Sequence, residues 1–137
     1  VSLIDAGSTQ IHLINRTKSR AESLAREFGN KIRVEDWKNR SNTLLNASLL
    51  VNTTSLGMTG QPPLDINLDV LPTAAIVNDI VYAPLETPLL ATARSRGNIT
   101  IDGLGMLLHQ ARPGFEIWFG TDPEVTEAMR NIVLKSE

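Results

Sequence analysis

Apolar residues along this chain fall into two kinds of pattern that alternate with each other. One kind is a short run of consecutive apolar residues, with the length of a buried strand and no polar alternation. These runs lie at residues 11–14, 32–34, 48–52, within 74–82 (centred on 75–77) and 99–101. Continuous runs are typical of parallel strands covered on both faces. The pattern therefore predicts an α/β fold in which a doubly wound parallel sheet lies between two layers of helices.

The other kind of pattern repeats every three or four residues and predicts helices. Thr17 is the expected N-cap of a helix that Gly29 ends in the C′ position. The apolar stripe of this helix comprises Ala21, Leu24, Ala25 and Phe28. Thr87 followed by Pro88 predicts a second helix start, and this helix ends at Gly97. Its residues expected to face inward are Leu89, Leu90 and Ala93.

The C-terminal third of the chain predicts two more helices. Residues 103–118 form the first, which we expect to bend at Pro113 because proline removes a backbone donor. Residues 121–124 have the spacing of a capping box, with Thr first and Glu last, and begin the second. The stripe that follows comprises Val125, Ala128, Met129, Ile132 and Val133. At the other end, residues 1–6 have the pattern of a helix end, while 37–46 support no assignment.

Composition narrows the classes of function. A chain of 137 residues fits one domain, and 42% hydrophobic with 20% charged residues is ordinary for a globular one. The net charge of −2 argues against nucleic acid or an anionic membrane as a bulk electrostatic partner. The absence of cysteine excludes disulfides and zinc-thiolate sites. No apolar stretch reaches the length of a membrane span. We therefore expect a cytoplasmic protein with no metal, no nucleic-acid partner and no membrane partner.

A cationic segment follows the first predicted strand and begins the next helix. It comprises Asn15, Arg16, Thr17, Lys18, Ser19 and Arg20. An NAD site in a doubly wound sheet usually has Asp or Glu here, whereas this segment has three cations and no acid. Arginine offers a planar fork of donors, and the helix start adds free N–H groups. The segment thus suits the 2′-phosphate of NADP, although a solvated basic helix start would show the same residues.

Three further segments lie at predicted strand ends. Residues 52–58 are rich in Thr, Ser and Gly and could pack closely beneath a ligand, but on these residues alone a plain turn is the favoured explanation. Residues 78–84 place a tyrosine just past a strand, and 103–110 place glycine at a strand-to-helix junction, where it would permit the approach of a flat ring. His12 and His109 are not spaced as metal ligands, and Trp37 and Trp118 are expected in the core or an interface.

Together, in this order, the four segments resemble the C-terminal half of shikimate dehydrogenase. The first, Asn15-Arg16-Thr17 with Arg20, is similar to the clamp of that family for the NADP 2′-phosphate. The second, 52–58, is similar to its Asn-Ala-Thr-Ser loop, with Thr53 in place of alanine. The matches in the third and fourth are Asp79-Ile80-Val81-Tyr82 with Thr87-Pro88-Leu89-Leu90, and Gly103-Leu104-Gly105-Met106-Leu107 with Gln110, Phe115, Trp118 and Gly120. Ala111 stands where many members have glycine.

The resemblance implies a fold, an activity and residue roles. The fold is a Rossmann-like domain, and the activity is reduction of 3-dehydroshikimate to shikimate with NADPH in aromatic amino-acid biosynthesis. The cofactor-binding residues would be Asn15, Arg16, Thr17, Lys18, Ser19 and Arg20 at the phosphate, Thr54, Ser55 and Ile80 along the groove, and Gly103 and Met106 by the nicotinamide. Tyr82 and Gln110 would reach the substrate, shikimate or 3-dehydroshikimate. A homodimer stays open.

The resemblance also implies parts that this chain does not contain. The glycine-rich loop and its strand would lie just before Val1, so residues 1–137 would form a partial NADP-binding domain. The catalytic lysine and aspartate would belong to an N-terminal substrate domain, so no residue here is assigned to catalysis. The first strand is central in the order 3-2-1-4-5-6, and without it we expect two groups of strands with unpaired edges. The 137-residue piece alone should then be unstable or associate.

Two alternatives to this function come from the same residues. One is a quinate/shikimate dehydrogenase that uses NAD, which would not need the cationic segment for a 2′-phosphate. The other is a non-catalytic module that binds or senses NADP. Tyr82 and Gln110 argue against the second alternative, because a cofactor sensor has no use for residues directed at a substrate.

Overall fold

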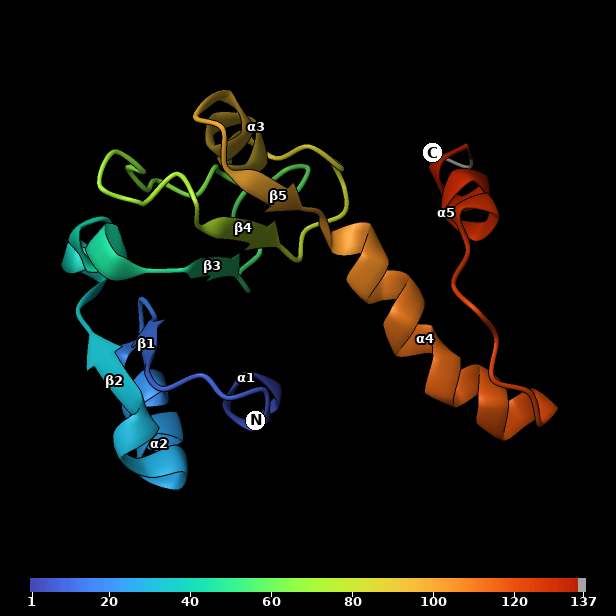
Figure 1. Ribbon diagram of the computed structural model, residues 1–137, viewed down its shortest axis with the longest axis horizontal. Helices are drawn as coiled ribbons and strands as arrows, with labels where there is room; N and C mark the ends of the chain where they lie inside the picture. The colour runs from blue at the N-terminus through green and yellow to red at the C-terminus, as the bar shows by residue number, and fades with distance from the viewer. Residues whose placement is uncertain (136–137) are drawn as a thin grey trace. The chain divides into compact units, whose positions relative to one another are not determined.

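The computed structural model describes residues 1–135, which divide into two compact units. The first unit comprises Val1–Ala47 and Ile66–Pro72, and the second comprises Ser48–Asp65 and the chain from Thr73 onward. All strand pairs described for these residues are parallel. The α/β class with parallel strands, as predicted, is confirmed (Figure 1).

The first unit pairs two short strands beneath one helix. Its elements are α1 (Ser2–Asp5), β1 (Ile11–Ile14), α2 (Lys18–Phe28), η1 (Gly29–Lys31), β2 (Ile32–Glu35), η2 (Trp37–Asn39) and η3 (Asn42–Asn46). β1 pairs with β2 in parallel, with Ile11 opposite Ile32, and α2 packs against both strands. The buried apolar residues are Ala21, Leu44, Leu68 and Leu71. Residues 66–72 are tied to this unit by Asn67 N, which donates to Ser41 Oγ at 2.9 Å.

The second unit holds a three-stranded parallel sheet in the order β3-β4-β5. Its elements are β3 (Leu49–Asn52), β4 (Ile76–Asp79), α3 (Pro88–Ser95), β5 (Ile99–Ile101), α4 (Gly103–Phe119) and α5 (Glu127–Leu134). In this unit α3 packs against β4 and β5, α4 extends from the end of β5, and α5 contacts α4 (Figure 1). The buried apolar residues are Leu56, Ala75, Val77, Val81, Leu89, Leu90, Ala93 and Leu104.

Most predicted elements are confirmed, because the apolar runs, caps and helix ends that predict them lie within or next to the element itself. The strands form within the predicted runs, and Leu89, Leu90 and Ala93 of α3 are buried as expected. The strands also fall into the two expected groups, β1-β2 and β3-β4-β5. Residues 37–46, which supported no assignment, form the short turns η2 and η3.

Two structural predictions are wrong. The strands were expected to be buried on both faces, yet β1, β2 and β5 contain no fully buried residue. In the described part of the chain one helix packs closely on each of them, α2 on β1 and β2 and α3 on β5. The capping box at 121–124 does not begin a helix. Thr126 caps α5 instead, accepting from Met129 N at 3.3 Å, while Asp122 pairs with Arg112, whose Nε lies 2.9 Å from Oδ1.

Candidate functional site

The cationic segment lies where β1 ends and α2 begins. Asn15 is half-buried directly after the strand, and residues 16–20 are exposed. Thr17 stands at the N-cap with extended backbone, but its side chain makes no capping hydrogen bond, so the expected capping role is fulfilled by position only. Lys18, Ser19 and Arg20 form the first turn of α2. The unit thus groups all six predicted phosphate-binding residues at one helix N-terminus.

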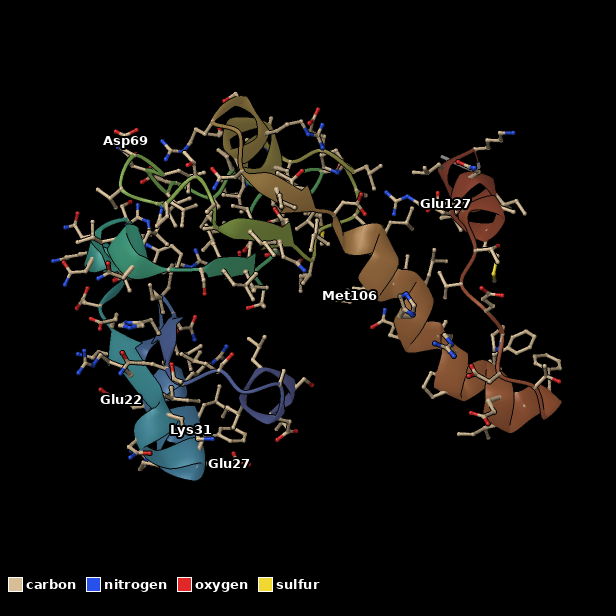
Figure 2. All side chains as sticks on the ribbon, viewed as in Figure 1. Glu22, Glu27, Lys31, Asp69, Met106 and Glu127 are labelled. Carbon is tan, nitrogen blue, oxygen red and sulfur yellow. The ribbon has the colours of Figure 1, made fainter. Side chains whose placement is uncertain are left out.

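The electrostatics of this segment are unusual for a helix start. The first turn of α2 contains no acidic residue, and the nearest glutamates on the helix are Glu22 and Glu27, which Figure 2 labels. Among the described residues, no carboxylate forms an ion pair with Arg16, Lys18 or Arg20. Positive charge at a helix N-terminus opposes the helix dipole. An anion bound here would relieve that repulsion and gain donors from side chains and from the helix backbone.

The loop after β3 is held by the buried side chain of Asn52, the last residue of that strand. Asn52 Oδ1 accepts from Thr54 N at 3.0 Å and from Thr54 Oγ1 at 2.8 Å. Asn52 Nδ2 donates to Leu56 O at 3.0 Å, and Leu56 N donates to Thr54 Oγ1 at 3.1 Å. These bonds fix the conformation of the predicted groove residue Thr54. Ser55 is exposed and belongs to the same turn, since its carbonyl accepts from Met58 N at 3.2 Å.

Asp79, the last residue of β4, connects this loop to the next one. Its side chain is 0% exposed. Oδ1 accepts from Asn52 Nδ2 and from Val81 N, both at 3.0 Å, and Oδ2 accepts from Thr87 Oγ1 at 2.7 Å. Thr87 Oγ1 in turn accepts from Leu90 N and caps α3, as its sequence position predicted. The ends of β3 and β4 and the start of α3 are therefore joined through one carboxylate.

Gly103 is the point where α4 comes closest to the end of β4. A Cβ at this position would collide with the Ile80 carbonyl group and would lie 2.6 Å from Val81 O. The backbone N–H of Gly103 also donates to Val81 O at 3.3 Å. The approach of a flat ring to Gly103 stays a prediction, and the neighbour that the structure gives this glycine is the Ile80–Val81 backbone. The structure brings two of the predicted cofactor residues, Ile80 and Gly103, into contact.

The remaining predicted residues of this unit are accessible. Tyr82 follows β4 and is 38% exposed, and Met106, which Figure 2 labels on α4, is 40% exposed. Gln110 is exposed and lies about two turns beyond Gly103 on the same helix. Among the hydrogen bonds described for residues 1–135, none uses the side chain of Tyr82 or Gln110, so both polar groups are available to a ligand.

A residue pair that sequence reasoning did not single out secures the start of α4. Asp102 is its N-cap and accepts from Leu104 N at 3.1 Å. The same carboxylate is held by both terminal nitrogens of Arg130, from α5, with Nη1 at 3.1 Å from Oδ1. The hydrogen bond to Asp102, more than the charge alone, raises the pKa of Arg130 above its ordinary value. Asp102 had a readable signal, because Asp before a helical glycine is a preferred N-cap.

Sequence reasoning also gave no role to Asn52 and Asp79 as a linked pair. Both follow buried apolar runs, but their mutual contact joins residues 27 positions apart and depends on the register of β3 against β4. His12 Nδ1 lies 3.2 Å from Glu35 Oε1 across the β1–β2 pair. Trp118, by contrast, is 78% exposed and is not a core residue of this chain.

Other classes of site find no support among the described residues. Over residues 1–135, no three side chains of the metal-ligating types His, Asp and Glu cluster so that they could hold an ion. Over the same range, no helix has both the length and the apolar character that crossing a bilayer requires.

Parallel strands, polar residues at their carboxyl ends and a cationic helix start define an α/β domain of the Rossmann-like, nucleotide-binding class. Residues 103–134 match the family model described as the shikimate 5′-dehydrogenase C-terminal domain. Over nearly its whole length the chain is similar to the C-terminal half of shikimate dehydrogenases.

Curated relatives match nearly the whole chain. A shikimate dehydrogenase (NADP(+)) of Dinoroseobacter shibae is 56% identical over 133 residues, which are 97% of this chain and 48% of the relative. One of Nitrobacter hamburgensis is 58% identical over 131 residues, 96% of this chain and 46% of the relative. The chain thus spans about half the length of the curated relatives it matches.

Solved structures agree in fold. A quinate dehydrogenase from Corynebacterium glutamicum in complex with NAD has a TM-score of 0.87 at 30% identity, covering 98% of this chain and 49% of that one. A shikimate 5-dehydrogenase from Thermus thermophilus in complex with NADP(H) and shikimate has a TM-score of 0.74 at 32% identity, covering 90% of this chain and 44% of that one.

Proposed function

We propose that this chain is the NADP-binding domain of a shikimate dehydrogenase. In the full-length protein it would bind NADP(H) for the reversible reduction of 3-dehydroshikimate to shikimate. The names of curated relatives at 54–58% identity specify shikimate dehydrogenase and NADP. The chain covers about half of each, so the activity belongs to a longer protein than the residues described here.

The observation that carries this proposal is the uncompensated positive charge at the start of α2. A 2′-phosphate needs charge-assisted donors, and a planar guanidinium supplies two in parallel. Arg16 precedes the helix, Arg20 is on its first turn, and Asn15 and Thr17 add neutral groups. An acidic residue that would accept from the ribose hydroxyls of NAD is missing from this strand end. The residues present therefore fit NADP better than NAD.

Residues of the second unit are assigned to the cofactor by the family resemblance. Thr54, Ser55 and Ile80 lie in loops after β3 and β4, at the edge of the sheet where ligands of parallel α/β domains bind. Gly103 and Met106 would lie beside the nicotinamide. Tyr82 and Gln110, both exposed and free of hydrogen bonds among residues 1–135, would donate to or accept from the substrate's oxygen atoms.

The chemical roles within this chain are binding and orientation. NADP(H), when bound, supplies or accepts the hydride. Holding the ring and the substrate in one geometry lowers the barrier because it removes much of the entropy cost of the encounter. The family resemblance places the proton-transferring lysine and aspartate in the N-terminal domain, so we assign no general acid or base to residues 1–137.

The location and the partners of the protein are inferred from its net charge. The net charge of −2 offers no bulk attraction to nucleic acid or to an anionic membrane surface. We infer a cytoplasmic enzyme whose partners are small molecules. Light scattering of the full-length protein would decide whether it forms a homodimer.

The proposal is tested by cofactor preference. In the full-length protein, Arg16→Ala should weaken NADPH binding by about ten- to a hundredfold, because a hydrogen-bonded charge pair is lost. Binding of NADH, which has no 2′-phosphate, should change little. Isothermal titration calorimetry of both cofactors against both proteins measures the difference.

Arg26→Ala is the matched control for this experiment. Arg26 is also an exposed arginine of α2, but it lies in the last turn, where it donates to Ser23 Oγ. It should leave the affinity for NADPH at the wild-type value. Equal losses of NADPH and NADH in Arg16→Ala would defeat the 2′-phosphate assignment and favour the NAD-using alternative. A full-length protein that binds NADPH but does not turn over 3-dehydroshikimate would favour the non-catalytic module.

A further inference from the structure

The carboxylate of Asp79 is the most buried charged group described in this chain, and the proposed chemistry does not use it. Its side chain has no exposure to solvent. All three of its hydrogen-bond donors are neutral: an amide of Asn52, the N–H of Val81 and the hydroxyl of Thr87. Burying an ionisable carboxylate without a cation is expensive, and an apolar residue would fill the same space at lower cost. The group therefore calls for an explanation other than stability.

The three donors come from three different segments, and those of Asn52 and Val81 lead to predicted cofactor or substrate residues. Asn52 also fixes both polar groups of Thr54 and the carbonyl of Leu56. Val81 lies between Ile80 and Tyr82, and its carbonyl accepts from Gly103 N. One carboxylate thus sets the relative positions of the loop after β3, the loop after β4 and the start of α3.

Backbone hydrogen bonds also join the loop after β3 to the loop after β4. Ile80 N donates to Asn52 O at 3.1 Å, and Thr59 N donates to Ala83 O at 2.9 Å, so the two loops are joined on both sides of the carboxylate. The Ile80–Val81 backbone in turn lies against Gly103, with no space for a Cβ. A change at Asp79 would shift Thr54 through Asn52, and Ile80 and Gly103 through the backbone of Val81.

We infer that Asp79 is a positioning residue for the part of NADP(H) beyond the adenosine 2′-phosphate, acting through Asn52, Val81 and Thr87. This inference rests on the proposed function. It adds that affinity for the nicotinamide end depends on one buried carboxylate in the second unit. The cationic segment in the first unit is independent of it, because none of its residues shares a hydrogen bond with this network.

Two ligands separate recognition of the phosphate from recognition of the nicotinamide. NADPH contains both groups, whereas adenosine 2′,5′-bisphosphate lacks the nicotinamide. In Asp79→Asn an amide nitrogen replaces one carboxylate oxygen, so one of the three donors loses its acceptor. We expect the Kd for NADPH of the full-length protein to rise by about tenfold or more, as for loss of a hydrogen bond to a charged group. The Kd for adenosine 2′,5′-bisphosphate should stay unchanged.

A pair of substitutions at Thr87 repeats the test with smaller changes in shape. Thr87→Val removes the hydroxyl and leaves Oδ2 of Asp79 without its donor, whereas Thr87→Ser keeps that donor. The first should weaken NADPH binding selectively, and the second should restore it. This pair decides the question if Asp79→Asn does not fold.

Val77→Ala is the control for lost stability. Val77 is a fully buried residue of the same strand and makes no side-chain hydrogen bond, so its truncation lowers the melting temperature without altering the network. It should leave both affinities unchanged. Equal weakening of both ligands in Asp79→Asn, or of neither, would overturn the inference while the proposed function stands. A wild-type protein that binds neither ligand would overturn both.

Discussion

Gly103 is required because the backbone of α4 starts against another backbone rather than against side chains. The atoms that a Cβ would meet belong to the Ile80 carbonyl group and to Val81 O, and neither can move by rotating a side chain. The cost of adding a methyl group must therefore be met by shifting α4 or the end of β4. Gly105, two residues along the same helix, has no heavy atom within 4 Å of a Cβ position.

This contrast gives a prediction at the residue scale. Gly103→Ala should lower the free energy of unfolding by about 2 kcal/mol or more, because the added carbon overpacks a closed contact. Gly105→Ala should be neutral or stabilise by up to about 1 kcal/mol, because alanine favours a helix over glycine. Urea unfolding of the full-length protein measures both. Equal effects of the two substitutions would show that the contact at Gly103 is not specific.

Two helix starts show which boundaries can be predicted from neighbouring residues alone. Thr87 with Pro88 predicted the start of α3 correctly, because cap and proline act on adjacent backbone groups. The start of α5 was misplaced by five residues, from Thr121 to Thr126. Both threonines precede an acidic residue and the same apolar stripe, so local pattern does not separate them. Asp122 is engaged by Arg112 from α4, a tertiary contact that no local pattern reveals.

The helix cap supplies a prediction at the element scale. Thr126→Ala should destabilise α5 by about 1 kcal/mol, because Met129 N loses the oxygen that caps it. Thr121→Ala is the matched control and should have no effect on α5. Amide hydrogen exchange of residues 127–134 reports the local opening of this helix. Faster exchange in Thr121→Ala than in Thr126→Ala would restore the sequence-based assignment.

The two groups of candidate residues could be predicted from sequence to different extents. The cationic segment could be identified from sequence because its residues are consecutive, with three cations and no acidic residue among them. The network around Asp79 could not be predicted from sequence, because it depends on which strands pair and on the register of that pairing. Asn52 opposite Asp79 follows from the pairing of β3 with β4, and sequence alone specifies neither the pairing nor the burial.

At the scale of the whole molecule, the described chain leaves many groups that can pair with other chains. Within residues 1–135, β4 is the only strand with a partner on each side. The end of α4 exposes Ile117, Trp118 and Phe119 in succession, with Ile117 at 82% exposure. Open strand edges and contiguous exposed apolar residues both favour association.

We therefore expect the isolated 137-residue chain to associate in solution. Its weight-average mass by light scattering should rise with protein concentration, and its thermal unfolding should depend on concentration. Replacing Ile117 and Trp118 with lysine should reduce the mass toward that of a monomer. A monomer at every concentration, with one cooperative transition, would contradict this expectation.

The closed contact at Gly103 has a genetic consequence as well. Every single-base missense change of a glycine codon encodes an amino acid with a β-carbon, so no such change at this codon avoids the Ile80 carbonyl group. Codon 105 carries no such restriction, although it encodes the same amino acid in the same turn. A saturation library of the gene, selected for growth, should be depleted of missense variants at the first codon relative to the second.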